Sequence, residues 1–327
     1  MLVESSLPTA PEALALAHAR FLAQTGKITR ALGDLEAMPE PGHDLVRASW
    51  LATRLDCRLA RGDLAAADAV ADALAGLTDE DDLVGAIALH GLGEHVSALG
   101  DPDGALTNFL AAGDRLGGGE DDPETVPWRA GAALALVRTR RAREADGLAR
   151  EHLERSRRTG SAYVVAQAMR IVAATGSGGS RVACLREARS LLDQVPAERL
   201  AAQIDTDLGV LLSLDPSPTA QAEAVALLRG AEEYAGREDL FPLQHRIREN
   251  LQRLGQEPRR IRSETLATLT ATEQKAARMA AAGLTNREIA ETMKVTVKAV
   301  EWHLSHVYRK LGIRGRRGLA ASLGTSG

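Results

Sequence analysis

Helix-length segments of this chain are separated by Gly, Pro and Asp residues at nearly even intervals. The breaks inside successive pairs of segments fall at positions 26, 62, 100, 140, 178 and 215, so the intervals are 36, 38, 40, 38 and 37 residues. A steady period in this range is typical of stacked helical hairpins. The sequence contains no alternating run of β-branched residues, which would indicate a strand. Residues 10–255 are therefore predicted to form an all-α array.

The apolar residues of each unit follow the spacing of a helix that is buried on one face. Leu51, Leu55 and Leu59 recur one turn apart, and the segment from Leu64 to Leu74 continues the pattern. One such hairpin cannot bury its apolar face alone, so neighbouring hairpins must stack on it. Aromatic residues make up only 3% of the chain. The core must therefore be built from Ala and Leu, which favours close-packed helices over a β-sandwich.

The Gly-Asp and Gly-Lys junctions, each followed by an Ala-rich helix, resemble those of tetratricopeptide repeats. The aromatic positions of those repeats are mostly empty here, and the period is slightly long. A non-repetitive helical bundle is the alternative, because Ala- and Leu-rich helices imitate repeats. A repeat array would offer a concave surface for a protein, a peptide or a small-molecule ligand, and the sequence does not distinguish among these partners.

Few residues of the chain suggest catalysis or cofactor binding. Cys57 and Cys184 lie within helical apolar patterns and are expected to be small core residues rather than a disulfide or a zinc site. His90 and His95 are five residues apart, which places them poorly for a shared metal. The sequence contains no GxxxxGK[ST] motif for nucleotide phosphates. An enzyme is the least favoured class, and no catalytic residue, metal or cofactor is expected.

No apolar run approaches the roughly 18 residues that a membrane-spanning helix needs. The N-terminus also lacks a basic start followed by an apolar stretch, the pattern of a secretory signal. We therefore expect a cytoplasmic protein with no membrane partner.

Basic and acidic residues are unevenly distributed along the chain. Residues 259–318 contain 13 Lys and Arg and 5 Asp and Glu, a net charge of +8; because the whole chain carries −4, the remainder carries −12. A basic tail on an acidic body indicates nucleic-acid binding. A short segment with Pro258 and three arginines separates the two parts. We expect the array over 1–255, a linker over 256–265 and a second domain over 266–327.

The second domain contains start and stop signals for short helices. Thr270 with Glu273, and Thr285 with Glu288, have the spacing of capping boxes, in which each side chain bonds the amide of the other residue. Thr296 can cap a further helix, which a glycine ends near position 312. Two helices joined by a tight turn, the second of them longer and basic, indicate a helix-turn-helix.

The longer of these helices separates apolar from polar residues. Its outward face carries Trp302 among charged residues, which is unusual for a helix that touches only water and is explained if this face enters a groove. Its inward face is predicted to consist of Val300, Leu304, Val307 and Leu311, packed on Ile289 and Met293.

Over about 55 residues the tail resembles the LuxR-type DNA-binding domain. The matching stretches are LTATEQ, GLTNREIAETMKV and VEWHLSHVYRKLGI, followed by residues 316–319. The resemblance implies double-stranded DNA as a partner, binding as a homodimer on inverted half-sites, and RNA polymerase as a candidate partner. The groove-facing positions of the family correspond to Glu301, Trp302 and Ser305, and its phosphate-contacting positions to Arg287, Thr296, Lys298, Arg309 and Lys310.

This sequence departs from the family pattern at two positions. Ala299 replaces a hydroxyl residue, which removes one phosphate contact, and Glu301 stands where the family often has Lys. An acidic side chain cannot bond the acceptors of guanine, but it can accept from cytosine N4. A half-site different from the usual one of the family is therefore expected.

A helical-repeat region ahead of this domain resembles the C-terminal half of large ATP-binding LuxR-family regulators, the MalT-like group. Residues 126–136, VPWRAGAALAL, resemble their repeat region. The ATPase module of that group is not matched, so ATP-driven switching is not implied. A natural short form, a truncated gene and a fragment remain open as explanations.

The favoured hypothesis is a sequence-specific bacterial transcription regulator whose array receives a signal or a partner. The alternative is a helical-repeat interaction scaffold with a weak or relic DNA-binding tail. The intact capping boxes and apolar face favour the first hypothesis, because a decaying domain would be expected to lose them.

Overall fold

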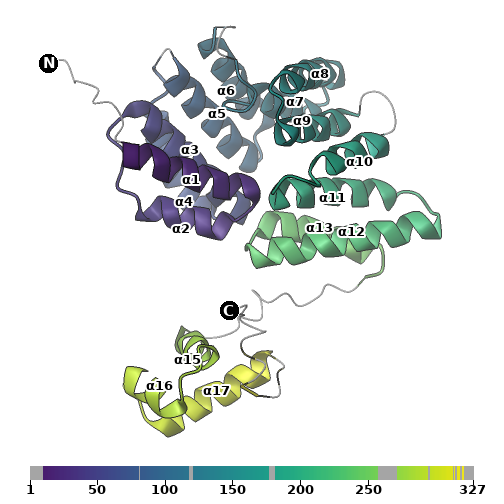
Figure 1. Cartoon of the computed structure of the whole chain (residues 1–327). Coiled ribbons are helices and arrows are strands. Elements are labelled where there is room, and N and C mark those ends of the chain that lie inside the picture. The colour runs from purple at the N-terminus through teal and green to yellow at the C-terminus, as the bar shows by residue number, and fades with distance from the viewer. Residues whose placement is uncertain are drawn as a thin grey trace, which may run out of the picture. The chain divides into compact units, whose positions relative to one another are not determined.

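The computed structural model describes residues 10–80, 82–117, 121–176, 181–256, 271–293 and 295–311, together with 313, 315–316 and 319. Over these residues the chain forms sixteen α-helices and no strand, which confirms the predicted all-α fold (Figure 1). The chain divides into two compact units, residues 1–256 and 257–327. The first unit is called the array below and the second the tail unit.

The helices of the array occur in pairs separated by short turns, and each pair packs as a hairpin. Their bounds are α1 (Ala10–Thr25), α2 (Ile28–Ala37), α3 (Asp44–Arg61), α4 (Leu64–Ala75), α5 (Leu83–Ala98), α6 (Pro102–Arg115), α7 (Trp128–Arg138), α8 (Ala142–Arg158), α9 (Ala162–Thr175), α10 (Arg181–Leu191), α11 (Glu198–Leu212), α12 (Pro218–Arg237) and α13 (Phe241–Arg253). All six predicted breaks fall between the two helices of a hairpin, although position 178 itself lies outside the described residues. The similarity to tetratricopeptide repeats stays a prediction.

The turn between α3 and α4 shows how the sequence ends one helix and begins the next. Gly62 has φ +75°, in the left-handed region that favours glycine, and its amide donates to the Leu59 carbonyl at 3.0 Å. The Asp63 amide donates to the Arg58 carbonyl at 3.0 Å, which completes a Schellman end. The Asp63 carboxylate then accepts from the Ala66 amide at 3.4 Å and caps α4.

The fourth hairpin makes its turn without a glycine. Arg140 lies between α7 and α8 with φ +62°, a conformation that side chains rarely adopt. The regular period predicted this break, whereas a search for glycine alone would have passed over it.

Close approach of helices is visible around Phe109 of α6, whose side chain is fully buried. A Cβ atom would come within 2.6 Å of the Phe109 ring at Gly93 of α5 and within 2.5 Å at Gly131 of α7. Both distances are shorter than non-bonded carbon atoms tolerate. The absence of side chains at these two positions therefore allows α5, α6 and α7 to enclose one large aromatic residue in an Ala-rich core.

The two ends of the array contact each other. α1 packs on α11 and α3 packs on α13, in addition to the stacking of α1, α3, α5, α7 and α9 along the chain (Figure 1). The largest buried apolar cluster combines residues of α1 to α6 with Leu228, Tyr234, Ile247 and Leu251 near the end of the array. The array is thus closed on itself, whereas the period predicted only that neighbouring hairpins stack.

Polar contacts join the same ends. The Tyr234 hydroxyl donates to the Gly26 carbonyl at 2.8 Å, and the Thr29 amide donates to the Glu238 carboxylate at 3.1 Å. The Arg199 guanidinium donates to both carboxylate oxygens of Asp56, at 2.6 and 2.8 Å. Such a two-point pair fixes orientation as well as distance. It joins residues 143 positions apart.

The two cysteines of the array and His95 occupy structural positions. Cys57 is buried, and burial raises the pKa of its thiol to about 12, so the thiol stays protonated. Cys184 is partly buried and donates to the Met169 carbonyl. His95 bonds Asp68 at 2.7 Å through Nε2. In the described parts of the chain, no group of three or more His, Cys, Asp or Glu side chains could hold a metal ion.

None of the helices in the described residues combines the length and the apolar character that crossing a membrane requires.

The tail unit contains three helices in its described residues: α15 (Ala271–Ala281), α16 (Asn286–Met293) and α17 (Val297–Leu311). All three pack on one another. Gly283, with φ +93°, ends α15 through bonds from its own amide to the Ala280 carbonyl and from the Leu284 amide to the Met279 carbonyl. The shared core consists of Ala276, Ala277, Ala280, Ile289, Ala290, Val300, Leu304, Val307 and Leu319.

Candidate nucleic-acid interface

Side-chain caps fix where α16 and α17 begin. The Thr285 amide donates to the Glu288 carboxylate at 2.7 Å, and the Glu288 amide donates to the Thr285 hydroxyl at 3.3 Å, so the predicted capping box is present. These bonds lower the pKa of the Glu288 carboxyl and keep it ionised. The Thr296 hydroxyl accepts from the Ala299 amide at 3.2 Å and caps α17. For the other predicted box, Thr270 lies outside the described residues.

The inward face of α17 holds the helix against α16. Val300, Leu304 and Val307 are buried and share one cluster with Ile289, as predicted, while Met293 is partly buried against it. The Leu311 side chain lies outside the described residues. Since the inward residues recur every three or four positions, the residues between them face away from the core.

The outward face of α17 carries the three predicted base-facing residues. Glu301 and Ser305 are exposed, and Trp302 is 57% exposed. The Trp302 ring lies on the His306 ring, with 4.1 Å between their centroids. The Nδ1 atom of His306 is 2.9 Å from the Trp302 carbonyl oxygen, which fixes this histidine one turn further along the helix. The contacting rings of Trp302 and His306 therefore form an aromatic surface on the same face as Glu301 and Ser305.

The described phosphate candidates lie at the beginnings of α16 and α17. Thr296 and Lys298 are exposed at the start of α17. The Thr296 oxygen accepts the capping bond, so its hydroxyl hydrogen is available to a phosphate. Arg287 is exposed on α16, 3.4 Å from Glu291. The backbone of Arg309 and Lys310 belongs to α17, but their side chains lie outside the described residues.

Arg316 has a role that the sequence did not predict. Its guanidinium donates to the carbonyls of Ala280 and Leu284 and to the Asn286 side chain, and so it links the residues after α17 to the turn between α15 and α16. Carbonyls at the end of a helix are often bonded by basic side chains, but the sequence does not show which arginine reaches them. The ring contact between His306 and Trp302 was also not predicted, although the i, i+4 spacing of these two residues is a signal for contact.

Comparison with known proteins matches the tail unit to one family. Residues 267–323 match the family described as bacterial regulatory proteins, luxR family. A predicted HTH-type transcriptional regulator of Mycobacterium bovis and two of Mycobacterium tuberculosis are each 43% identical to this chain over 49 residues. That segment is 15% of this chain and 6% of each relative. The C-terminal unit therefore carries a LuxR-type helix-turn-helix, and the matched segment is a small part of much longer relatives.

Proposed function

We propose that this protein is a sequence-specific DNA-binding transcription regulator, in which the tail unit reads the DNA and the array receives a signal. The observation that carries the proposal is the LuxR-family match over the three packed helices, the last of which presents an exposed aromatic and polar face. The intact core and capping box support a working domain over a relic.

In this proposal α17 enters the major groove. Glu301, Trp302 and Ser305 reach base edges, where a carboxylate accepts from cytosine N4 and an aromatic ring contacts the thymine methyl group. Arg287, Thr296, Lys298, Arg309 and Lys310 contact phosphates. Phosphate contacts supply affinity through counterion release, and the groove-facing side chains supply sequence preference.

One unit of this size makes few base contacts, so we propose that two chains bind together. A symmetric dimer would occupy inverted half-sites, because the symmetry of the protein is mirrored in that of its site. RNA polymerase is a candidate partner of the assembled complex.

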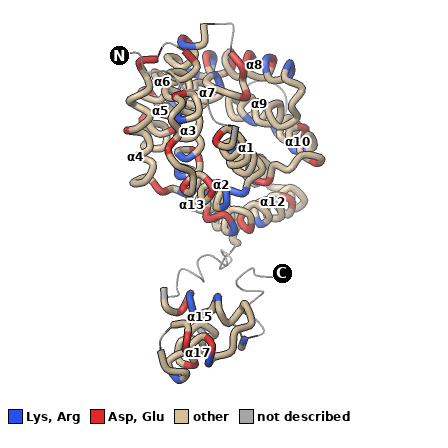
Figure 2. The backbone as a smooth tube through the Cα atoms, turned by 60° about the vertical axis from the view of Figure 1, so that its left-hand side comes forward, with Lys and Arg blue, Asp and Glu red and all other residues tan. Residues whose placement is uncertain are grey.

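We assign signal reception to the array because its net charge does not suit contact with DNA. The residues outside 259–318 carry −12. Figure 2 shows Asp and Glu positions interspersed with Lys and Arg positions along its helices. A helical-repeat scaffold whose tail binds DNA only weakly is the competing function.

The experiment that tests the proposal is selection of bound duplexes from a random DNA pool by the full chain at near-physiological salt. Enrichment of an inverted repeat supports a dimeric, sequence-specific regulator. If neither the full chain nor residues 264–327 enriches any sequence, the scaffold function replaces it. Enrichment by residues 264–327 alone would place inhibition in the array.

A further inference from the structure

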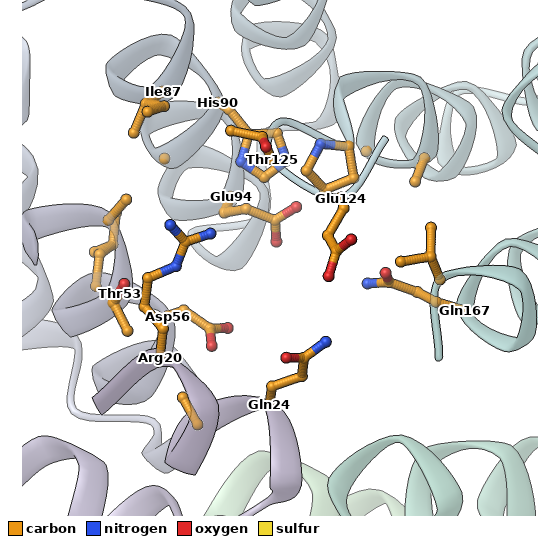
Figure 3. A pocket seen from close by; sticks show the side chains of 18 of the residues that line it. Arg20, Gln24, Thr53, Asp56, Ile87, His90, Glu94, Glu124, Thr125 and Gln167 are labelled. Carbon is orange, nitrogen blue, oxygen red and sulfur yellow. The ribbon is translucent and has the colours of Figure 1, made fainter. Parts of the chain in front are cut away.

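The closed array contains a cavity of about 390 Å³ that is partly open to solvent. Its wall is formed by the odd-numbered helices α1, α3, α5, α7, α9 and α11 and by the segment that precedes α7 (Figure 3). This volume lies within the range of about 300 to 1,000 Å³ that is typical of small-molecule sites. Because the wall includes both ends of the array, the cavity exists only when those ends are together.

Two of the arginines in the wall are already neutralised by carboxylates. Arg199 of α11 makes its two-point pair with Asp56 of α3. Arg170 of α9 donates to Asp207 at 2.7 Å. These pairs connect wall elements to their neighbours, and their charges are largely unavailable to an anionic ligand.

Two carboxylates in the same wall have no such partner. Figure 3 shows the side chains of Glu94, from α5, and Glu124, from the segment before α7, directed into the cavity from one side. Among the described residues, no hydrogen bond or ion pair engages either carboxylate. Both glutamates are exposed. Desolvation by neighbouring protein still raises the pKa of the Glu94 carboxyl to about 7, with a smaller contribution from the charge of Asp56 that Arg199 opposes. A carboxylate that is exposed on the wall of a cavity and has no protein partner is available to a positively charged ligand.

The rest of the lining fits the remainder of a small polar molecule. Figure 3 shows the Arg20 guanidinium and the amides of Gln24 and Gln167 directed into the same space. Ile87 and Leu134 provide apolar contacts. The cavity therefore offers two acceptors for a positively charged nitrogen, one donor group for a carboxylate, and apolar surface between them.

We propose that this cavity binds a small organic amine in its protonated form, with Glu94 and Glu124 as the carboxylate partners of the ammonium group. Arg20 gives amino acids a second contact, to their carboxylate. A ligand that binds only the closed array stabilises the closed form, and the stabilisation increases with the logarithm of its concentration once this exceeds the Kd. The binding itself is independent of DNA, whereas its role as the signal rests on the proposed function.

The test is calorimetric titration of the full chain, without DNA, with four amines: L-lysine, L-arginine, putrescine and spermidine. Sodium succinate and sodium chloride at matched ionic strength serve as anionic and salt controls. We expect saturable binding of at least one amine at one site per chain, and a rise in melting temperature with its concentration. We expect no saturable binding of succinate.

Three variants assign that binding to the cavity. Glu94→Gln and Glu124→Gln should each weaken binding at least about tenfold, the value of one lost charge-assisted bond. Glu187→Gln removes an exposed carboxylate on α10, outside the cavity, and should leave the affinity unchanged. Circular dichroism establishes that each variant is folded before it is titrated.

The proposal is overturned if none of the four amines binds saturably, if succinate binds instead, or if folded Glu94→Gln and Glu124→Gln variants bind as tightly as the wild type. Because no DNA is present, these outcomes leave the DNA-binding proposal untouched. Conversely, a failed duplex selection leaves amine binding intact.

Discussion

Helices α8 and α17 are both amphipathic, but their outward faces differ. On α8, Arg150, Arg155 and Arg158 each pair with an acidic residue four positions earlier. On α17, no ion pair with a described residue engages Lys298 or Glu301, and Trp302 is exposed beside them. The comparison shows that charge content alone does not identify an interface. A face whose charges are satisfied within the helix needs only water, whereas the face of α17 retains groups that a partner can use.

The largest expected effect is a loss of folding stability in the tail unit alone. Leu304→Ala removes a buried side chain from the core beneath α17 and should cost about 2 to 5 kcal/mol, which is enough to unfold a unit of this size. DNA binding is then lost, while the melting transition of the array stays unchanged. Differential scanning calorimetry with a DNA-binding assay measures both. A shifted array transition would mean that the two units do not unfold independently.

The difference between the outward faces of α17 and α8 can be tested with one substitution on each helix. Lys298→Ala should weaken binding to all duplexes, and the slope of log affinity against log salt should fall by about 0.9, the value for one phosphate contact. Arg150→Ala on α8 is the matched control and should leave the slope unchanged. Equal effects of the two substitutions would show that the α8 face contributes to DNA binding as much as the α17 face.

Removal of the capping box of α16 should have a smaller effect on the stability of the tail unit. Thr285→Ala removes the hydroxyl that accepts from the Glu288 amide and should destabilise the tail unit by about 1 kcal/mol. Differential scanning calorimetry, which follows the transition of each unit, measures it. The matched change Ser217→Ala at the start of α12, where the Ser217 hydroxyl accepts from Ala220, should lower the array transition instead. A tail unit that melts at the wild-type temperature without Thr285 would contradict the capping role.

The smallest expected effect is a dependence of the stability of the array on pH. The Glu94 carboxyl has a pKa of about 7 in the folded array and an ordinary value of 4.5. The contribution of this carboxyl to the folding stability of the array is therefore fully present below pH 4.5 and is lost as the pH rises through 7. Glu94→Gln should melt a few degrees above the wild type at pH 8 and at nearly the same temperature at pH 4.5, since water in the cavity screens part of the charge. A difference that does not vary with pH would exclude titration of Glu94 as its cause.

Local features of the fold could be predicted from sequence. The breaks at positions 26, 62 and 100 follow from glycine and cap signals, and the caps of α16 and α17 from Thr285 and Thr296. These signals act within about six residues of the chain, so each one is visible in a short stretch of sequence. The buried face of α17 was predictable for the same reason, because its period is that of one helix.

Closure of the array could not be predicted in this way. It depends on the small rotation that each hairpin adds, accumulated over six hairpins, and only that total brings Arg199 to Asp56 or Tyr234 to Gly26. The cavity residues Glu94 and Glu124 were overlooked for the same reason. In the sequence each is one more acidic residue on a helix or a loop, and only the closed arrangement brings them to one space.

The central claim is that the outward face of α17 reads DNA sequence. The most direct measurement is the affinity of the wild type and of Trp302→Ala for the selected duplex and for a random duplex at one salt concentration. The account predicts that the ratio of specific to random affinity falls about tenfold or more in the variant, with little change on random DNA. Equal losses on both duplexes would contradict it and would reduce Trp302 to a non-specific contact.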